Sequence, residues 1–358
     1  MRHPKHLFLI LIGIFAVYEL FSSWKVNEIY PCGLPSHSIT INYYGKLGNN
    51  MAEYATLWYY NKILQNTAAF ILPEMERALL PVFPNISLPV YRISKSCEDM
   101  FISMNGYKHR DIVNLFERNA NVSTHVIIRD APNPVHLYNL YKSDILREFQ
   151  FSERIYANVQ AYQHYLYSIH CKTSRICDSV KHVGIHVRRT DYENWMAEHD
   201  RELVNENFFL NAMEEITERM GKLKEGEKLV FIVTSDDSKW CKERFPRHFE
   251  PSDVTMNNSV SPSIVYTVDY YPIILQKYLD TYNLFDCTNK GCINSVKNEY
   301  VYFDLALLSS MNYNIYDYGS YGFWGAYLSQ SNIIIHADQR ENPFGPSTME
   351  ILLKSLSH

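Results

Sequence analysis

The chain has 358 residues, enough for about two domains of ordinary size. Hydrophobic residues make up 46% and charged residues 20%, which is typical of folded globular proteins and excludes disordered, collagen-like and coiled-coil chains. Lysine and arginine number 34 against 39 aspartate and glutamate, a net charge of −5, so we expect no broad basic surface and no nucleic-acid partner. Any anionic ligand must be held by a few placed cations.

The N-terminus carries a candidate membrane anchor. An apolar run from Leu7 to Phe21 follows a short basic segment. Because the basic residues all precede the run and no clear small-x-small site follows it, we favour an uncleaved signal anchor over a cleaved signal peptide. We expect a cytoplasmic tail over residues 1–6, a transmembrane helix in the lipid bilayer over 7–24 and a stem over 25–37, with the bulk of the chain in the lumen of the secretory pathway.

Cysteines and sequons fit an oxidising lumen. The seven cysteines include no C-x-x-C pair, which disfavours a zinc ribbon and a thioredoxin-type site. Short-range disulfides could join Cys171 to Cys177 and Cys287 to Cys292. Sequons at Asn85, Asn121 and Asn257 would be available for N-glycosylation there.

The predicted elements alternate between strands and helices. In chain order we expect a strand at 38–44, a glycine turn at 45–50, helices at 51–64 and 151–170, a strand at 183–187, a helix at 207–220, a strand at 229–234 and a short helix near Lys239. A loop-rich insertion over 247–299 precedes a helix at 300–310, a strand at 313–316, a helix at 323–329 and a strand at 333–336. This pattern predicts an α/β protein with two Rossmann-like domains, 38–180 and 181–358, and chemistry in the loops after the strands.

Several standard motifs are missing from the sequence. It contains no G-x-G-x-x-G, no G-x-x-x-x-G-K-[ST], no H-E-x-x-H and no G-x-S-x-G, which disfavours nicotinamide enzymes, P-loop NTPases, zincins and nucleophile-elbow hydrolases. It also contains no D-x-D, the carboxylate pair with which many luminal enzymes hold a nucleotide diphosphate through a metal. We therefore expect no metal and no cofactor.

The most informative segment follows the predicted strand at 183–187. His186 and Arg188 share the strand face opposite Ile185, and Arg189 begins the loop. Two guanidinium groups at the carboxyl end of a strand can clamp a pyrophosphate without a metal, and Asp191 could orient one of them. The alternative is a structural salt bridge between one of these arginines and Asp191.

Three further loops carry polar residues at strand ends or helix starts. Candidate binding residues are Gly45, Gly48 and Asn49 in the first loop, Ser235, Asp236 and Asp237 in the second, and Ser320, Tyr321 and Gly322 in the third. Glycines allow close approach to an anion at a helix N-terminus, and carboxylates could accept from ribose or guanine. The alternatives are ordinary helix capping, including by Ser235 or Asp236, and a core position for the rings of Phe323 and Trp324.

The segment H-V-R-R-T-D-Y resembles the H-[VI]-R-R-x-D-Y motif of the α1,2-fucosyltransferases of glycosyltransferase family 11. The segments at 45–55, 231–243 and 304–328 resemble the family's G-R-L-G-N-Q-M-G-E-Y-A, T-S-D-D with W-C, and D-L-A-L-L with G-F-W segments. Departures are Lys46, Asn50, Ala52 and Thr190, where the family usually has Arg, Gln, Gly and Gly. Asn50 bears on donor affinity, because it shortens an amide that could touch the nucleotide or brace the loop.

The resemblance implies a GT-B-like arrangement, with an acceptor domain and a GDP-fucose domain facing a cleft. It implies inverting transfer of L-fucose from GDP-β-L-fucose to the 2-hydroxyl of a galactose-terminated glycan, in a type II protein of the Golgi membrane. Catalytic roles would fall to Arg188, Asp191 and His186, with donor contacts from Gly45, Gly48, Asn49, Asn50, His186, Arg188, Arg189, Ser235, Asp236, Asp237, Ser320, Tyr321 and Gly322. Asp191, Glu53 and His186 all remain candidates for the general base.

Two alternative functions stay open. One is a luminal glycan-binding protein that keeps the fold without turnover, against which the intact Arg188 and Asp191 argue. The other is a fucosyltransferase with a different acceptor or linkage, against which the W-C and G-F-W segments argue.

Overall fold

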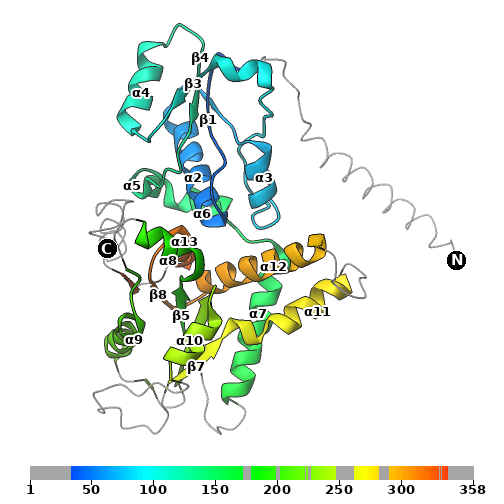
Figure 1. Ribbon diagram of the computed structural model, residues 1–358, viewed down its shortest axis with the longest axis vertical. Coiled ribbons are helices and arrows are strands. Elements are labelled where there is room, and N and C mark those ends of the chain that lie inside the picture. The colour runs from blue at the N-terminus through cyan, green and yellow to red at the C-terminus, as the bar shows by residue number, and fades with distance from the viewer. Residues whose placement is uncertain are drawn as a thin grey trace, which may run out of the picture.

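The computed structural model describes residues 34–171, 179–198, 202–221, 223–224, 227–246, 262–281, 290–329, 331 and 333–337. Two all-parallel sheets divide these residues into an upper and a lower half in Figure 1. The parallel sheets confirm the predicted α/β class. The expected tail and anchor, and the stem up to residue 33, lie outside the described residues. Within the described ranges, no helix combines the length and the apolar character needed to cross a bilayer.

The first sheet has the strand order β2-β1-β4-β3. Its strands are β1 (His37–Ile41), β2 (Ala68–Ala69), β3 (Phe101–Met104) and β4 (Thr124–Ile128). All residues of β1 and β4 are buried, as expected for central parallel strands covered on both faces. The helices of this half are α2 (Leu47–Ile63), α3 (Pro73–Leu79), α4 (His109–Arg118), α5 (Val135–Tyr138) and α6 (Lys142–Glu148).

The second sheet has the order β7-β6-β5-β8-β9. Its strands are β5 (Ser179–Val187), β6 (Glu227–Ser235), β7 (Ser263–Tyr266), β8 (Tyr313–Tyr316) and β9 (Ile334–His336). The accompanying helices are α8 (Thr190–Ala197), α9 (Glu206–Met220), α10 (Ser238–Arg244), α11 (Tyr271–Thr281), α12 (Lys290–Ser309) and α13 (Ser320–Ser329). Strand β5, at the centre, carries the H-V-R-R segment at its carboxyl end.

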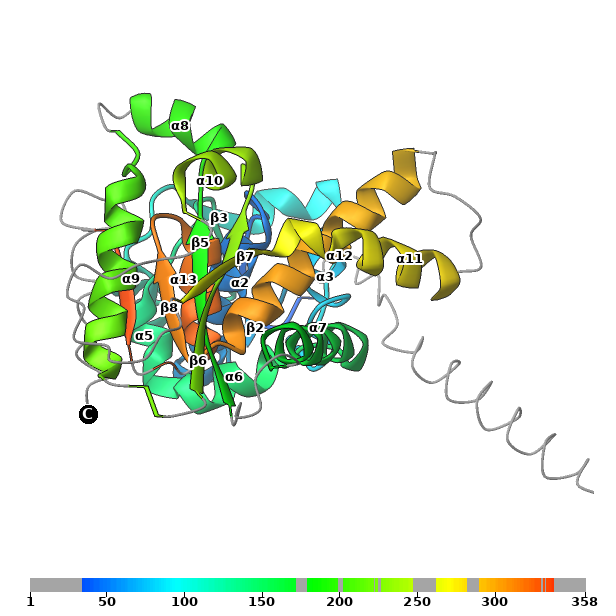
Figure 2. The same ribbon diagram turned by 90° about the horizontal axis from the view of Figure 1, so that it is seen from below.

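Three expectations about the elements need correction. Helix α2 begins at Leu47 rather than at 51, so most of the glycine turn is the helix's first turn. The insertion at 247–299 is not mainly loop, because it contains β7, α11 and the first half of α12. Helix α7 (Glu153–Cys171), expected to close the first half, packs on α12 and α11 of the second half, as Figures 1 and 2 show. The Tyr162 ring on α7 contacts Tyr270 and Phe303.

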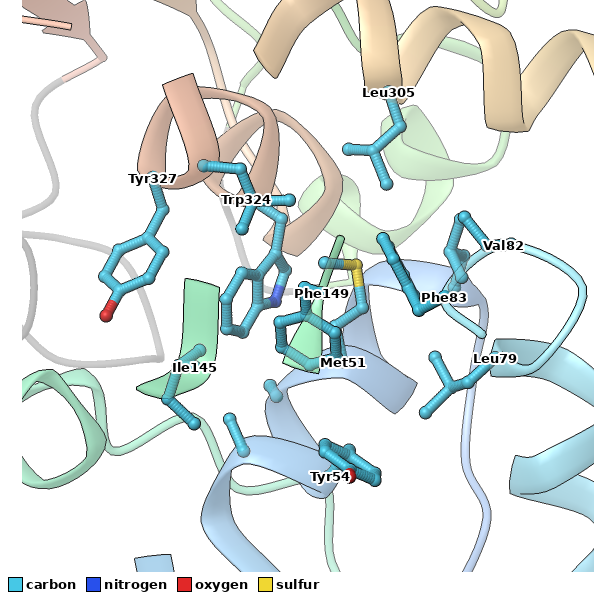
Figure 3. Packing of buried hydrophobic residues seen from close by; sticks show 14 of the residues in the cluster. Met51, Tyr54, Leu79, Val82, Phe83, Ile145, Phe149, Leu305, Trp324 and Tyr327 are labelled. Atoms are coloured by element: carbon cyan, nitrogen blue, oxygen red, sulfur yellow. The ribbon is translucent and has the colours of Figure 1, made fainter. Parts of the chain in front are cut away.

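The largest buried hydrophobic cluster of the described residues spans the two halves. Met51 and Tyr54 of α2, Phe149 after α6 and Trp324 of α13 belong to one buried cluster, shown in Figure 3. The Trp324 ring stacks on Tyr138 with centroids 5.6 Å apart and meets Phe149 edge-on at 5.1 Å. The rings of Phe323 and Trp324 are therefore core, as the alternative interpretation held. Burying such rings stabilises the contact between the halves.

Cysteines and sequons are partly described. Cys97 and Cys171 are each disulfide-bonded, and Cys241 is a free, buried thiol. Cys177 and Cys287, and the side chain of Cys292, lie outside the described residues. Asn85 and Asn121 are exposed, whereas the third sequon lies outside the described ranges.

Candidate active site

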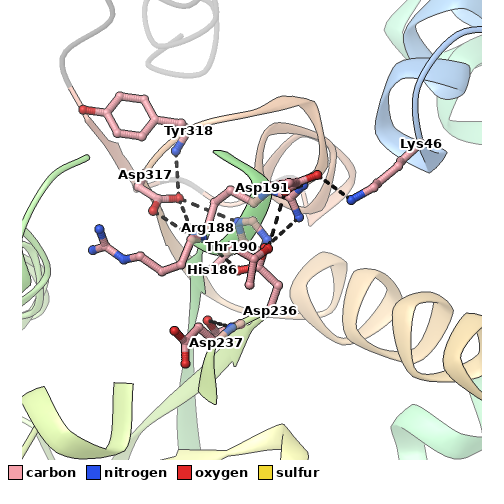
Figure 4. Close-up of polar contacts among 11 residues, drawn as sticks. Lys46, His186, Arg188, Thr190, Asp191, Asp236, Asp237, Asp317 and Tyr318 are labelled. Carbon is pink, nitrogen blue, oxygen red and sulfur yellow. Dashed lines mark hydrogen bonds and ion pairs between the residues drawn. The ribbon is translucent and has the colours of Figure 1, made fainter. Parts of the chain in front are cut away.

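Arg188 lies directly after β5, where the sheet faces the first half. Its backbone N–H donates to both carboxylate oxygens of Asp317, at 3.1 and 2.9 Å. Asp317 directly follows β8 and also accepts the Tyr318 N–H, so it ties the carboxyl ends of two neighbouring strands together (Figure 4). Burial raises the pKa of Asp317 to about 7, against the opposing effect of these donors. Asp317 was not among the residues predicted from the sequence, in which its position directly after a predicted strand is its only signal.

The Arg188 guanidinium is held between two carboxylates. Nη1 lies 3.0 Å from Oδ2 of Asp236, and Nη2 donates to Oδ1 of Asp191. The side chain is 21% exposed, so the cation is fixed in direction and still reachable from solvent. The ion pair with Asp191 is the salt bridge that the alternative interpretation expected, and the second carboxylate, Asp236, holds the same guanidinium.

Asp191 lies in the first turn of α8 and contacts both halves of the molecule. Its Oδ2 accepts from Nζ of Lys46, in the turn between β1 and α2, at 2.7 Å. Partial burial acts to raise the pKa of Asp191, but the Lys46 hydrogen bond and the charge of Arg188 outweigh it and hold that pKa below its ordinary value. Asp191 is therefore ionised at neutral pH. Lys46 was not predicted to be a site residue, and in the sequence it stood out only as a difference from the family motif.

Arg189 points away from Arg188 and its carboxylates. Its guanidinium carbon lies 3.8 Å from the centroid of the Trp240 ring, and Nη2 donates to the Val204 carbonyl at 2.6 Å. The residue is only 8% exposed. The Arg189 guanidinium therefore does not lie beside that of Arg188, as the predicted two-arginine clamp requires, and it connects the end of β5 to α10 and to the segment before α9.

The residues at the end of β6 either hold the segment after β5 in place or cap helix α10. Asp236 accepts from the Arg189 N–H at 2.8 Å and from the Thr190 hydroxyl at 2.6 Å, in addition to contacting Arg188. Asp237 caps α10 by accepting from the Trp240 N–H, so the cap is Asp237 and not Ser235 or Asp236. The Ser235 hydroxyl accepts from the Asp237 N–H.

The N-termini of α2 and α13 meet beside this cluster. The Ser320 hydroxyl donates to Oδ1 of Asn49 at 2.5 Å. A Cβ on Gly48 would lie 2.7 Å from the Tyr321 nitrogen, so only glycine allows this approach. Residues from the first and third predicted loops thus come together at two adjacent helix N-termini.

Three candidate residues lie beneath this surface. His186 is buried against Tyr321 and Gly322, and burial together with the charge of Arg188 lowers its pKa, so the ring is neutral at neutral pH. Asn50 is fully buried and donates to the Tyr44 carbonyl and to Glu53, which makes it a brace of the turn. Burial raises the pKa of Glu53 to about 8, although the Asn50 bond opposes it.

No group of three or more His, Cys, Asp or Glu side chains among the described residues is placed to hold a metal ion. The charged groups at the site are instead Arg188 and Lys46 with the carboxylates of Asp191, Asp236 and Asp317.

Known proteins resemble this chain in sequence and in fold. It is 27% identical over 309 residues to galactoside alpha-(1,2)-fucosyltransferase 2 of Sus scrofa, covering 85% of this chain and 74% of the relative. It is 26% identical over 312 residues to galactoside 2-alpha-L-fucosyltransferase SEC1 of Bos taurus, covering 87% and 70%. A solved mutant of Arabidopsis thaliana FUT1 in complex with GDP has a similar fold, with a TM-score of 0.50, 11% identity, and coverage of 86% of this chain and 72% of that one. The glycosyl transferase family 11 model matches residues 15–268, and the chain belongs to this family, as its four motifs predicted.

Proposed function

We propose that this protein is an inverting, metal-independent fucosyltransferase that moves L-fucose from GDP-β-L-fucose to the 2-hydroxyl of a galactose-terminated glycan. The observation that carries the proposal is Arg188, fixed at the carboxyl end of the central strand by Asp191 and Asp236, with Lys46 of the first half bound to the same Asp191 carboxylate. Membership of family 11 and the names of the two mammalian relatives support this donor and acceptor.

The chemistry follows from where charge develops. The bond between fucose C1 and the β-phosphate oxygen breaks as C1 bonds to the galactose 2-oxygen on the opposite face, and the acceptor hydroxyl loses its proton. Negative charge grows on the phosphate, and a fixed guanidinium with helix-terminal amides stabilises it without reorganising. Arg188 is the residue to which we assign this role.

We assign proton acceptance to Asp191. Of the three candidate bases it is ionised at neutral pH and its side chain is 53% exposed beside Arg188. Glu53 is fully buried with a raised pKa, and His186 is buried with its own pKa lowered. A base must be deprotonated and reachable by the acceptor hydroxyl, and Asp191 meets both conditions.

The deciding experiment incubates the full chain with GDP-fucose and a panel of β-galactosides, with and without EDTA. We expect an α1,2-linked product, no transfer to a 2-deoxygalactoside, and no effect of EDTA. Arg188→Ala should reduce kcat/KM at least about a hundredfold, whereas Arg219→Ala, an exposed arginine on α9, should not. Another linkage would overturn the acceptor assignment. GDP-fucose binding without transfer to any acceptor would favour a glycan-binding protein without turnover.

We also propose that the protein acts in the Golgi as a type II membrane protein, anchored by residues 7–24. The apolar run and its basic flank support this placement. Alkaline extraction should leave the protein in the membrane fraction. A glycosidase-sensitive N-glycan on Asn121 would place the catalytic region in the lumen. Release of the protein by alkaline extraction would contradict the anchor.

A further inference from the structure

The carboxylate of Asp191 bridges two cations that come from opposite halves of the molecule. Oδ1 accepts from Nη2 of Arg188, at the end of β5, and Oδ2 accepts from Nζ of Lys46, in the turn after β1, at 2.7 Å. Figure 4 shows Lys46 extending from the first half towards this carboxylate. The Asp191 carboxylate thus occupies the space between the two cations.

A carboxylate in such a position is a chemical stand-in for a phosphate. Both groups present oxygen acceptors with negative charge, and guanidinium and ammonium groups bind both. The Lys46 and Asp191 side chains are 73% and 53% exposed, so their ion pair contributes little to stability and a more highly charged ligand can displace it.

The turn that bears Lys46 is fastened to the other half. The Lys46 carbonyl accepts from the N–H groups of Asn49 and Asn50, at 2.9 and 3.1 Å. Asn49 is bonded in turn to Ser320 at the start of α13. Gly45, at φ +70°, makes the reversal that brings the chain into this turn. The base of the Lys46 side chain is therefore positioned by contacts between the halves.

We propose that Lys46 is the second cation of the diphosphate site, and that Asp191 occupies that site until the donor displaces it. This inference rests on the proposed function, because it takes the ligand to be a nucleoside diphosphate sugar. With Lys46 as the second cation, Arg188 can be the one arginine of the second half that binds the diphosphate, since the side chain of Arg189 lies against Trp240. Displacement also frees the Asp191 carboxylate from both cations, which makes it a better proton acceptor when the donor is bound.

The test is calorimetric titration of the full chain with GDP and with guanosine, which lacks the phosphates. We expect Lys46→Ala to weaken GDP binding about tenfold and leave guanosine binding unchanged, because a charge-assisted contact to phosphate is lost. Lys46→Arg should restore GDP binding. The matched control is Lys62→Ala. Lys46 directly precedes helix α2 and Lys62 lies in the last turn of that helix, about 24 Å away along its axis.

Asp191→Asn provides the opposite test. It removes the competing charge while keeping the side chain's shape, so GDP should bind more tightly than to the wild type. With GDP-fucose as substrate, Lys46→Ala should raise the KM for the donor more than it lowers kcat.

If Lys46→Ala has an unchanged GDP affinity and a lowered Tm, Lys46 makes only a structural contact between the halves. That result would overturn the inference and leave the proposed function standing. Weaker GDP binding to Asp191→Asn would contradict the displacement. If the wild-type chain binds neither GDP nor GDP-fucose, the proposed function and the inference both fail.

Discussion

At the scale of single residues, the two adjacent arginines differ in what their side chains do. The Arg188 guanidinium is partly exposed and lies between the carboxylates of Asp191 and Asp236, whereas Arg189 packs on Trp240 and donates to Val204. Arg189→Ala should therefore lower the free energy of unfolding by about 2 kcal/mol, through loss of a desolvated cation–π contact and a buried hydrogen bond.

The corresponding measurements are urea unfolding and GDP titration. Arg189→Ala should keep most of its GDP affinity under conditions where it is folded, and Arg188→Ala should lose most of it with little change in stability. Equal losses of GDP affinity in the two variants would restore the two-arginine clamp predicted from the sequence.

Glu53 is expected to make stability depend on pH. Burial raises its pKa from 4.5 to about 8, so between these values the folded state holds a proton that the unfolded state has released. Unfolding then releases a proton, and the stabilising contribution, complete below about pH 4.5, is lost as pH rises to about 8, by roughly 1.4 kcal/mol per pH unit. Glu53→Gln stays neutral throughout and should lack this component.

The comparison is urea unfolding of the wild type and Glu53→Gln at pH 5, 6.5 and 8. Their difference isolates Glu53 from other buried carboxyls with raised pKa, such as Asp304 and Asp317, which both proteins share. The glutamine variant should gain stability relative to the wild type as pH rises. A difference that does not vary with pH would mean that Glu53 is ionised in the folded protein, with an ordinary pKa.

At the scale of elements, the contact between the N-termini of α2 and α13 sets the geometry of the site. A Cβ on Gly48 would meet the Tyr321 nitrogen and the Ser320 carbonyl carbon at 2.7 and 2.8 Å, and backbone atoms cannot move aside as a side chain can. Gly48→Ala should therefore separate the helices, lower stability by about 1–3 kcal/mol and weaken GDP binding severalfold.

Gly106→Ala is the matched control. Gly106 has φ +81° but open space around its Cβ position, so alanine there strains only the local backbone. It should lower the Tm and leave GDP affinity unchanged. If Gly48→Ala behaves like this control, the helix contact does not position the donor.

The elements that the sequence predicted well are those with a strong pattern. In β5, Ile185 packs in the core on the α9 side while Gly184 faces α12, which is the alternation expected of H-V-R-R. Strands β2, β3, β4 and β7 were missed, and strand length alone does not explain this, since the predicted strands β8 and β9 have only four and three residues. Side-chain direction was the other limit: Arg189 turns towards Trp240, more than fifty positions away, and a motif does not contain that partner.

At the scale of the whole molecule, the division into two halves was visible in the sequence but their connection was not. Strand and helix alternation indicated two sheets, and the described part of the chain forms two. Helices of one half pack on helices of the other, and these partners are far apart in the sequence. Helix α7 packs on α12, and α13 packs on α2. The Lys46 to Asp191 contact joins residues 145 positions apart. We therefore expect the halves to unfold as one cooperative unit.

Trp324 tests this cooperativity. It is fully buried at the junction, stacked on Tyr138 and in contact with Phe149. Trp324→Ala should lower the free energy of unfolding by about 3–5 kcal/mol, and Trp324→Phe by clearly less, because the larger cavity forfeits more contacts. Since the core is shared, wild-type unfolding should be one transition in calorimetry, and Trp324→Ala should shift it as a whole. Two separated transitions, with only one moved by the substitution, would show that each half folds on its own core.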